Sequence, residues 1–413
     1  MLFSQLQAEL DQRAAQGLLR RRRTLESAQS PHIRVDGQDY LSFCSNDYLG
    51  LSSQPQLITA LQQGAAQWGV GAGAAHLVSG HFAPHHQLEQ QLAAFVGKPA
   101  ALLFSTGYMA NLGVVQALVG KDDTVFADKL NHASLNDAML LSRATVKRYR
   151  HNDMAQLAQL LGQTAGGRKL VITDAVFSMD GDLAPLPQLL ALCEQHDAWL
   201  LVDDAHGFGV LGAQGRGALH HHFPSLSSSL PAGREGDGSL SRERERVRER
   251  VDSPRIIYMG TLGKGAGVSG AFVAAEQVVI DTLINHARSY VYTTASPPAL
   301  AVALLHSLQL IEQGDGLRAH LQQLIAQLKL GLAGLPWQLM PSDTAIQPLL
   351  VGDNERALQL SNALRERGIW VAAIRPPTVP QGTARLRITL SAAHTAADVD
   401  QLSEALHALA QES

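Results

Sequence analysis

Cysteine, long apolar runs and strong net charge are all scarce in this 413-residue chain, and each shortage excludes a class of protein. The two cysteines, Cys44 and Cys193, are far apart and lack metal-ligand spacing. We therefore expect no disulfide framework and a reducing, cytoplasmic setting. No run of about 18 apolar residues occurs, so no membrane span is expected. The polar N-terminus lacks the apolar segment of a secretory signal.

The charge of the chain is close to balanced. The formal net charge is −4 and charged residues make up 17% of the chain, so no nucleic-acid partner is indicated. Apolar residues make up 46%, which is enough for a sizeable core. At this length we expect one large domain and a smaller one.

Lysine is also rare, and one lysine stands in an unusual context. Lys264 follows an apolar, strand-like run at 255–259 and lies in a stretch with four glycines between residues 263 and 270. Glycine lets the backbone pass close to a ligand, and a buried lysine amine readily loses its proton and forms Schiff bases. A solvated lysine in a flexible loop is the alternative, and Lys129 is the only rival for a reactive role. The seven lysines are Lys98, Lys121, Lys129, Lys147, Lys169, Lys264 and Lys329.

Strand-like and helix-like segments alternate from residue 100 onward. This alternation predicts an α/β fold, in which a mostly parallel sheet is covered by helices on both faces. The strand-like runs are Ala101–Phe104, Thr124–Ala127, Thr145–Tyr149, Leu170–Thr173, Trp199–Val202, Ile256–Met259 and Ala271–Ala274. The helix-like runs between them are about 108–119, 133–142, 153–161 and 186–196.

The expected domain organisation has three parts. Residues 1–45 form an N-terminal helical arm with a hairpin, residues 46–312 form the large domain, and residues 313–413 form a small α+β domain. Residues 220–254 interrupt the large domain with a polar, charged segment that has few apolar residues, and we expect this insertion to be mobile. It begins with three consecutive histidines, whose side chains would point in different directions, so no metal site is expected.

Polar motifs follow several of the strands, where ligands bind in such sheets. Residues 105–108 end a strand and open a helix, which is a typical seat for a phosphate. Asp203, Asp204 and His206 follow another strand, and Thr261 precedes Lys264 by three residues. Caps, turns and satisfied core polar groups explain each motif singly but explain the set poorly. The set is what pyridoxal phosphate (PLP) requires: a phosphate seat, a lysine for its aldehyde and an acid for its ring nitrogen.

The chain resembles the α-oxoamine synthases, a family of fold-type I PLP-dependent transferases. The matching motifs are residues 45–51, 177–182, 202–207 and 260–264, and the resemblance covers nearly the whole chain outside 220–254. A finer match, to one branch of the family, rests on residues 151–153, 345–354, 374–380 and 383–387. This branch implies a PLP-dependent acyltransferase of biotin biosynthesis, acting in a cytoplasmic homodimer. Its substrates would be L-alanine and a pimeloyl thioester of coenzyme A or of an acyl carrier protein.

The resemblance also implies roles for individual residues. Lys264 corresponds to the Schiff-base lysine and Asp203 to the acid that keeps the ring nitrogen protonated. His206 and Ser178 correspond to the groups that hydrogen-bond the ring hydroxyl, and His132 to the histidine that stacks on the ring. Lys264, His132, Asp203 and His206 are thus the implied catalytic set.

Further contacts are implied for the phosphate and for the substrates. The implied phosphate contacts are Gly107, Tyr108 and Thr261, with Thr293 or Thr294 added from the other subunit. Asn46 and Arg387 correspond to the grip on the amino-acid carboxylate, with His132 also facing the substrate. Arg20 and Thr378 correspond to contacts with the acyl substrate.

Two departures from the family pattern and two alternatives stay open. Ala74, Ala75 and His76 stand where relatives often carry glycine, serine or threonine and a small or basic residue, and the insertion after Gly217 is longer than usual. The nearer alternative is a sister reaction with glycine and a shorter acyl-coenzyme A. The other is a non-catalytic scaffold in which the charged insertion serves as a docking arm.

Overall fold

The computed structural model describes residues 2–20, 22–223 and 252–412. Most of the predicted insertion, residues 224–251, lies outside the described residues, including the alternating charged stretch at 241–250. His220, His221 and His222 are described and belong to the short helix α8 (Ala218–His222). None of the described helices has the length and apolar character needed to cross a membrane.

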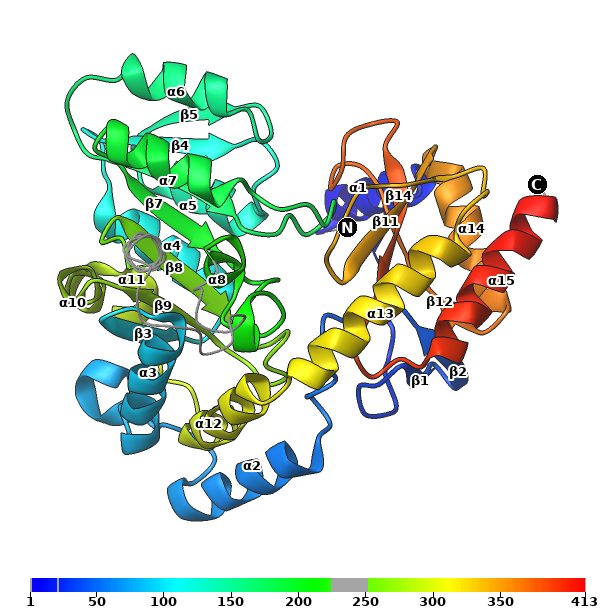
Figure 1. Cartoon of the computed structure of the whole chain (residues 1–413), viewed down its shortest axis with the longest axis horizontal. Helices are drawn as coiled ribbons and strands as arrows, with labels where there is room; N and C mark the ends of the chain where they lie inside the picture. The colour runs from blue at the N-terminus through cyan, green and yellow to red at the C-terminus, as the bar shows by residue number, and fades with distance from the viewer. Residues whose placement is uncertain (1, 21, 224–251, 413) are drawn as a thin grey trace, which may run out of the picture.

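A seven-stranded sheet forms the large part of the molecule, on the left in Figure 1. Its pairs are parallel from β8 through β7, β6 and β4 to β5, and β9 runs antiparallel between β8 and β3. The predicted α/β fold with a mostly parallel sheet is therefore confirmed, and every strand-like run of the sequence contributes a strand. In spatial order the strands are β3 (Ala100–Phe104), β9 (Ala271–Ala275), β8 (Ile256–Thr261), β7 (Trp199–Asp203), β6 (Lys169–Asp174), β4 (Thr124–Asp128) and β5 (Thr145–Tyr149).

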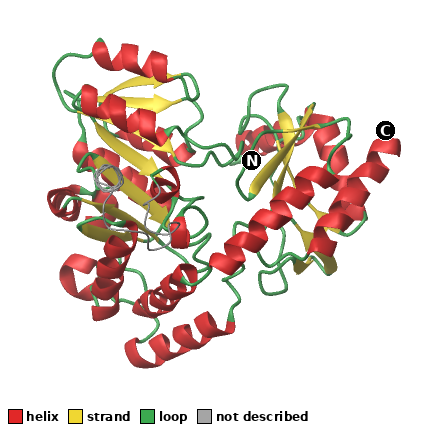
Figure 2. Cartoon of the chain, in the orientation of Figure 1, coloured by secondary structure: helices red, strands yellow, loops and turns green. Residues whose placement is uncertain are grey.

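Helices cover both faces of this sheet, as Figure 2 shows. Alternate residues of β7 face opposite sides of the sheet: Leu200 and Val202 belong to one apolar cluster, and Leu201 belongs to the other. One face is covered by α4 (Gly107–Leu118), α5 (Ala133–Leu141), α10 (Gln277–His286) and α11 (Arg288–Val291). The other face packs against α3 (Ala83–Val96), α6 (Met154–Gly162), α7 (Leu186–Gln195) and α12 (Pro298–Glu312). Shorter or peripheral elements are α2 (Pro55–Trp68), the π-helical turn η1 (His76–Gly80) and η2 (Ala213–Gly215).

The C-terminal part is a smaller α+β unit, on the right in Figure 1. Its sheet is antiparallel, in the order β10 (Gln338–Leu339), β11 (Ile346–Gly352), β14 (Ala384–Thr389) and β13 (Ala372–Ile374). Its helices are α13 (Asp315–Gly331), α14 (Asn354–Glu366) and α15 (Ala396–Glu412). The exact domain boundaries at 45/46 and 312/313 stay predictions.

The N-terminal arm extends this smaller unit. The hairpin of β1 (His32–Val35) and β2 (Gln38–Ser42) gains a third strand, β12 (Ile369–Trp370), which pairs in parallel with β2. Helix α1 (Ser4–Ala15) precedes the hairpin. Residues 369–374 form one apolar, strand-like run in the sequence, for which a single strand is expected. In the structure β12 and β13 join different sheets, and the buried Val371 between them pairs with a strand of neither sheet.

The two parts of the molecule meet at the loop that follows β6. Arg387 on β14 donates from Nε to the carbonyl oxygen of Ser178, at 2.6 Å, and Arg385 forms an ion pair with Asp180. The carbonyl oxygen of Gly181 accepts hydrogen bonds from Ser342 and Thr344. The smaller unit is therefore fixed against the edge of the sheet where the strands β6 and β7 end.

The glycine-rich turn after β8 has no room for a side chain at one position. Gly267 has a φ of +69°, and a Cβ there would lie 2.7 Å from both Leu51 Cβ and the Ser52 amide nitrogen. Gly263, four residues earlier, has only distant neighbours, the nearest at 3.9 Å. The turn is thus packed tightly against residues 51–52 at Gly267 but not at Gly263.

Gly267→Ala should destabilise the fold, because the substitution forces a left-handed backbone and a steric overlap on alanine. We expect a loss of about 1–3 kcal/mol in the free energy of unfolding, measured by denaturant titration. Gly263→Ala is the matched control and should change stability by less than about 0.5 kcal/mol. Equal stability of the two variants would show that the turn does not pack as described.

Candidate active site

Lys264 is held inside the turn that follows β8. The turn is closed by hydrogen bonds from Gly267 N to Lys264 O, at 2.9 Å, and from Leu262 N to Gly270 O, at 2.8 Å. The amine Nζ lies 3.0 Å from His206 Nε2. Burial lowers the pKa of Lys264, although the carboxyl groups of Asp203 and Asp174 act in the opposite direction. A lysine with a lowered pKa is a better nucleophile and base than a solvated one.

His206 links this amine to a buried tyrosine. Its second ring nitrogen, Nδ1, lies 2.5 Å from the hydroxyl oxygen of Tyr48, and both side chains are buried. Burial, with Lys264 as the next cause, lowers the pKa of His206 well below its usual range, so the imidazole is neutral. The Tyr48 hydroxyl donates to Asn46 Oδ1 at 3.2 Å, so it accepts from His206 Nδ1, and His206 Nε2 then offers its lone pair to the Lys264 amine. The sequence placed Tyr48 in a polar turn without a role, because its partner is 158 residues away.

Asp203 and Asp174 stand side by side at the ends of two adjacent parallel strands. Asp203 Oδ2 accepts from Asn111 Nδ2 at 2.7 Å, and Asp174 Oδ2 accepts from the His132 amide at 2.7 Å. Burial, reinforced by Asp203, raises the pKa of Asp174 well above its usual range. A protonated Asp174 leaves this pair with one carboxylate, which agrees with the cost of burying two like charges together. Sequence reasoning placed Asp174 in a polar motif after a strand without giving it a role, and it missed Asn111.

His132 caps the N-terminus of α5 and is exposed. Its Nδ1 lies 2.8 Å from the Ser134 hydroxyl, which in turn accepts from Asn111 Nδ2 at 2.9 Å. Burial of part of the ring lowers the pKa of His132, and the charge of Asp203 opposes that shift. The ring is therefore oriented by the same network that holds Asp203.

The N-terminus of α4 lies against Thr261. A Cβ added to Gly107 would be 2.7 Å from Thr261 Cγ2, so the loops after β3 and β8 touch at this point. Thr106 caps the helix by accepting from the Met109 amide at 3.2 Å, which leaves the first amides of the helix open to a ligand. The Tyr108 side chain is 44% exposed and its hydroxyl donates to Asp137, so Tyr108 offers the site its backbone amide.

Thr293 and Thr294, which were predicted to contact the phosphate in the other subunit, follow α11. The amide of the neighbouring Ala295 donates to the Ala74 carbonyl at 3.0 Å. The unusual stretch at residues 74–76 and these threonines thus share one neighbourhood. Lys129, the rival lysine, is exposed and its carbonyl oxygen accepts from Arg148, with no contact to the groups described above.

Arg387 is a buried cation with its guanidinium aimed at Asn46. Both Nη atoms lie 3.3 Å from Asn46 Oδ1, and Nη1 also donates to Thr389 Oγ1 at 2.9 Å. Arg387 is 7% exposed, yet in the described part of the chain no carboxylate forms an ion pair with it. A buried, unpaired guanidinium is an unfavourable arrangement that a bound carboxylate would relieve.

Arg20 and Thr378 line a groove between the N-terminal arm and the smaller unit. The groove has a volume of about 680 Å³, and its remaining walls are mostly apolar. Arg375 secures the arm by donating to the Gly17 carbonyl. The groove can therefore receive an apolar chain with Arg20 available to an anionic group. Its wall residues include Leu10, Leu18, Leu19, Ile374, Pro376 and Pro377.

Asp204, the second carboxyl of the motif formed by Asp203, Asp204 and His206, has a structural role. It is fully buried, and its Oδ2 accepts from the Tyr258 hydroxyl and from the Ala218 amide, both at 2.7 Å. Burial raises the pKa of Asp204 to about 7. This side chain therefore ties α8 to the sheet rather than serving the site.

Comparison with known proteins places this geometry in a family. Residues 38–406 match the family "Aminotransferase class I and II". A serine palmitoyltransferase from Sphingomonas wittichii superposes with a TM-score of 0.87 and 30% identity, covering 99% of this chain and 97% of that one. The serine palmitoyltransferase from S. paucimobilis, solved with PLP and myriocin bound, has a TM-score of 0.86 and 29% identity over 99% and 98% of the two chains.

More similar sequences narrow the family further. The 8-amino-7-oxononanoate synthase of Nitrosomonas europaea is 58% identical over 410 residues, which are 99% of this chain and 100% of the relative. That of Nitrosospira multiformis is 59% identical over 401 residues, covering 97% and 94%. The solved 8-amino-7-oxononanoate synthase of Francisella tularensis has a TM-score of 0.72 and 31% identity, covering 90% and 98%. The chain belongs to the aminotransferase class I and II family, in the branch of the 8-amino-7-oxononanoate synthases. The resemblance and the fold inferred from the sequence are thereby confirmed.

The buried Asp204 predicts a pH dependence of stability. Its pKa of about 7 in the folded chain exceeds the ordinary value of 3.8. Between these values the folded chain keeps a proton that the unfolded chain releases, so the stability contribution falls as the pH rises toward 7. In denaturant titrations at pH 5 to 8, Asp204→Asn should gain stability relative to the native chain up to about pH 7 and then stay level. The exposed control Asp122→Asn should track the native chain, and the same result for Asp204→Asn would disprove the assignment.

Proposed function

We propose that this chain catalyses the PLP-dependent, decarboxylative condensation of L-alanine with a pimeloyl thioester. The products are 8-amino-7-oxononanoate, CO2 and the free thiol, and the reaction serves biotin biosynthesis. The observation that carries the proposal is the convergence of Lys264, Asp203 and the unpaired Arg387 on one space at the edge of the sheet. The names of the relatives, which cover the whole chain, support the choice of substrates.

The residues present fit PLP. When bound, the cofactor withdraws electrons from the α-carbon of the amino acid and so makes its proton acidic. Lys264 supplies an amine of lowered pKa for the aldehyde, and the open amides of α4 with Thr261 suit the phosphate. Asp203 accepts one hydrogen bond on each carboxylate oxygen, from Asn111 and from the Ala205 amide, and still has lone pairs for the ring nitrogen.

Arg387 and Asn46 bind and orient the alanine carboxylate in this proposal. The fork of Arg387 is held in place by the Ser178 carbonyl and Thr389, so its two Nη atoms are oriented before the ligand arrives. Fixing the carboxylate also fixes the α-carbon, which must present its proton to the base.

Lys264 Nζ is the base that takes the α-proton and later returns it. The amine is held 3.0 Å from His206 Nε2, whose lone pair faces it, while His206 Nδ1 is occupied by Tyr48. Because the imidazole stays neutral, it orients the amine without competing for the proton. His132, oriented by the Ser134 hydroxyl at the N-terminus of α5, would lie against one face of the cofactor ring.

The groove lined by Arg20 and Thr378 would receive the acyl substrate, with its apolar walls along the pimeloyl methylenes and Arg20 at the distal carboxylate. Either coenzyme A or an acyl carrier protein delivers this chain. A homodimer in the cytoplasm completes the proposal, with Thr293 or Thr294 acting at the phosphate of the partner. The alternative is the sister reaction with glycine and a shorter acyl-coenzyme A.

Lys264→Ala should abolish both the visible absorbance of the attached cofactor and product formation, because no other amine occupies its position. Lys129→Ala, the matched control, should retain both. Absorbance spectra of the purified variants and mass spectrometry of the product are the measurements. Retention of the visible band in Lys264→Ala would refute the assignment of the lysine.

The same assay separates the proposed reaction from its sister. The native chain should convert alanine with pimeloyl-coenzyme A to a product of the mass of 8-amino-7-oxononanoate. Glycine with acetyl- or succinyl-coenzyme A should give little product. Preference for either glycine pair would favour the sister reaction.

Two arginine variants should separate the binding of the two substrates. Arg387→Lys keeps a charge but loses the fork, so the KM for alanine should rise about 10- to 100-fold while the cofactor absorbance is kept. Arg20→Ala should raise the KM for the pimeloyl thioester and leave the KM for alanine unchanged. Steady-state kinetics with each substrate varied in turn measures both. A rise of both KM values in either variant would contradict separate sites.

A further inference from the structure

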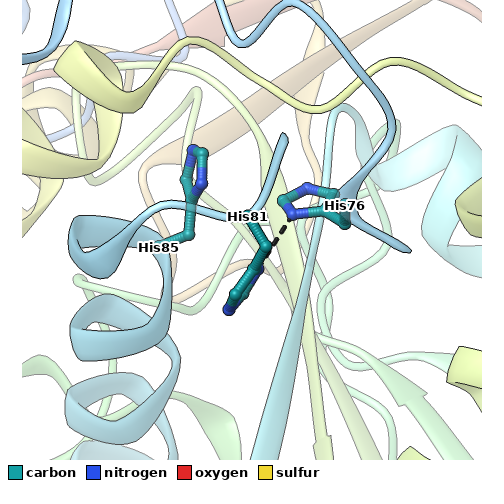
Figure 3. Close-up of side chains that lie close together, drawn as sticks. All are labelled: His76, His81 and His85. Atoms are coloured by element: carbon teal, nitrogen blue, oxygen red, sulfur yellow. Dashed lines mark hydrogen bonds between the residues drawn. The ribbon is translucent and has the colours of Figure 1, made fainter. Parts of the chain in front are cut away.

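Three histidines gather outside the candidate active site, between η1 and the start of α3 (Figure 3). His76 Nδ1 and His81 Nδ1 lie 3.0 Å apart, and the His76 and His85 ring centroids are separated by 5.1 Å. One ligand atom from each of the three rings lies within 4.8 Å of the others. Nitrogen atoms bound to one tetrahedral zinc at about 2.0–2.1 Å would be about 3.4 Å apart, so small side-chain movements would close the set.

Each ring is supported on the side away from the cluster. His76 stacks on Tyr290, with ring centroids 5.2 Å apart and an angle of 9° between the planes. His81 Nε2 lies 3.8 Å from Glu89 Oε2. His85 is 1% exposed, and the backbone carbonyls of Ser296 and Pro297 lie near its ring, although its buried Nε2 forms no hydrogen bond within the described residues. A carboxylate or carbonyl behind a histidine is the usual support of a metal ligand, because it fixes the tautomer and the ring orientation.

A neutral imidazole has a lone pair to offer a metal, and burial favours the neutral form of all three rings. Burial, reinforced by the neighbouring imidazoles, lowers the pKa of His76 to about 4. Burial lowers the pKa of His85 to about 4 as well and lowers that of His81. A cation at the centre would be coordinated by these lone pairs.

Two hydrogen bonds stand in competition with a metal, and one of them is the 3.0 Å contact between His76 Nδ1 and His81 Nδ1. His85 Nδ1 accepts from the Phe82 amide at 3.1 Å, and an ion bound at this atom would displace that amide. A second group, His81 with His86 and Glu89, is less prepared, because His86 Nε2 is already 3.1 Å from the Gln90 side-chain amide and Glu89 Oε1 accepts from the Leu103 amide. The first group is therefore the better site.

We propose that His76, His81 and His85 bind one divalent transition-metal ion, with zinc as the reference ion. A cavity of about 640 Å³ borders His76 and His81 and gives space for a water molecule beside these two rings. The ion would join η1 to α3 and so fix the stretch at Ala74–His76, where the sequence departs from the family pattern. No metal site was expected from the sequence, in which only the triplet His220–His222 was considered as a candidate.

The test uses the PLP-loaded full chain, stripped of metal and titrated with zinc in competition with a chromophoric zinc chelator. The native chain should bind one equivalent tightly. His81→Asn removes a ligand from an exposed position and should weaken this binding by at least about tenfold, and Glu89→Gln should weaken it by about 10- to 100-fold. Circular dichroism and thermal melting check that each variant is folded.

The histidine triplet in α8 provides the matched control. Replacing His220, His221 and His222 together by asparagine removes three other histidines and should leave the tight equivalent unchanged. X-ray absorption of the zinc-loaded native chain should report about three imidazole ligands, whether or not any variant folds. Absence of a tight equivalent, its loss in the triplet variant, or unchanged binding in His81→Asn would each overturn the proposal.

Discussion

The burial of one amine beside a neutral imidazole and a single carboxylate governs the candidate active site. Lys264 is held where burial lowers its pKa, and Asp203 and Asp174 would raise that pKa again if both carried charge. The raised pKa of Asp174 removes one of these charges. The site can thus hold the Asp203 carboxylate and the Lys264 amine close together without a second buried carboxylate beside them.

This arrangement depends on the contact between the two parts of the molecule. The loop after β6 carries the Ser178 carbonyl, which holds Arg387, and Asp180, which pairs with Arg385. The base of the loop is fixed by His151, whose ring lies between Asp128 and Asp182. Although burial acts to lower it, hydrogen bonds to the two carboxylates raise the pKa of His151 to about 10, so the ring stays charged. The guanidinium of Arg387 is therefore placed by a loop that is itself anchored by charge.

The sequence predicted the sheet and the main reactive groups, because both have local signatures. Apolar runs marked all the strands of the large sheet, and the glycines around Lys264 marked a close approach of backbone to ligand. Tyr48 and Asp174 lay in motifs that the sequence marked, but neither was given a role, and Asn111 was missed. Their roles arise from contacts with residues far away in the chain, such as that of Asn111 with Asp203, 92 positions further on. The split of 369–374 into two strands was missed for a similar reason: apolar alternation shows which residues are buried but not which sheet each strand joins.

The pairing of β2 with β12 has a consequence for the order in which the chain assembles. Leu41 pairs with Ile369, and the Phe43 amide donates to the Trp370 carbonyl at 2.9 Å. During synthesis the hairpin is therefore made more than 300 residues before β12, the strand with which it pairs. Until then the hairpin has no third strand and is only marginally stable by itself. We therefore expect this small sheet to be completed late in folding, when β12 pairs with the hairpin.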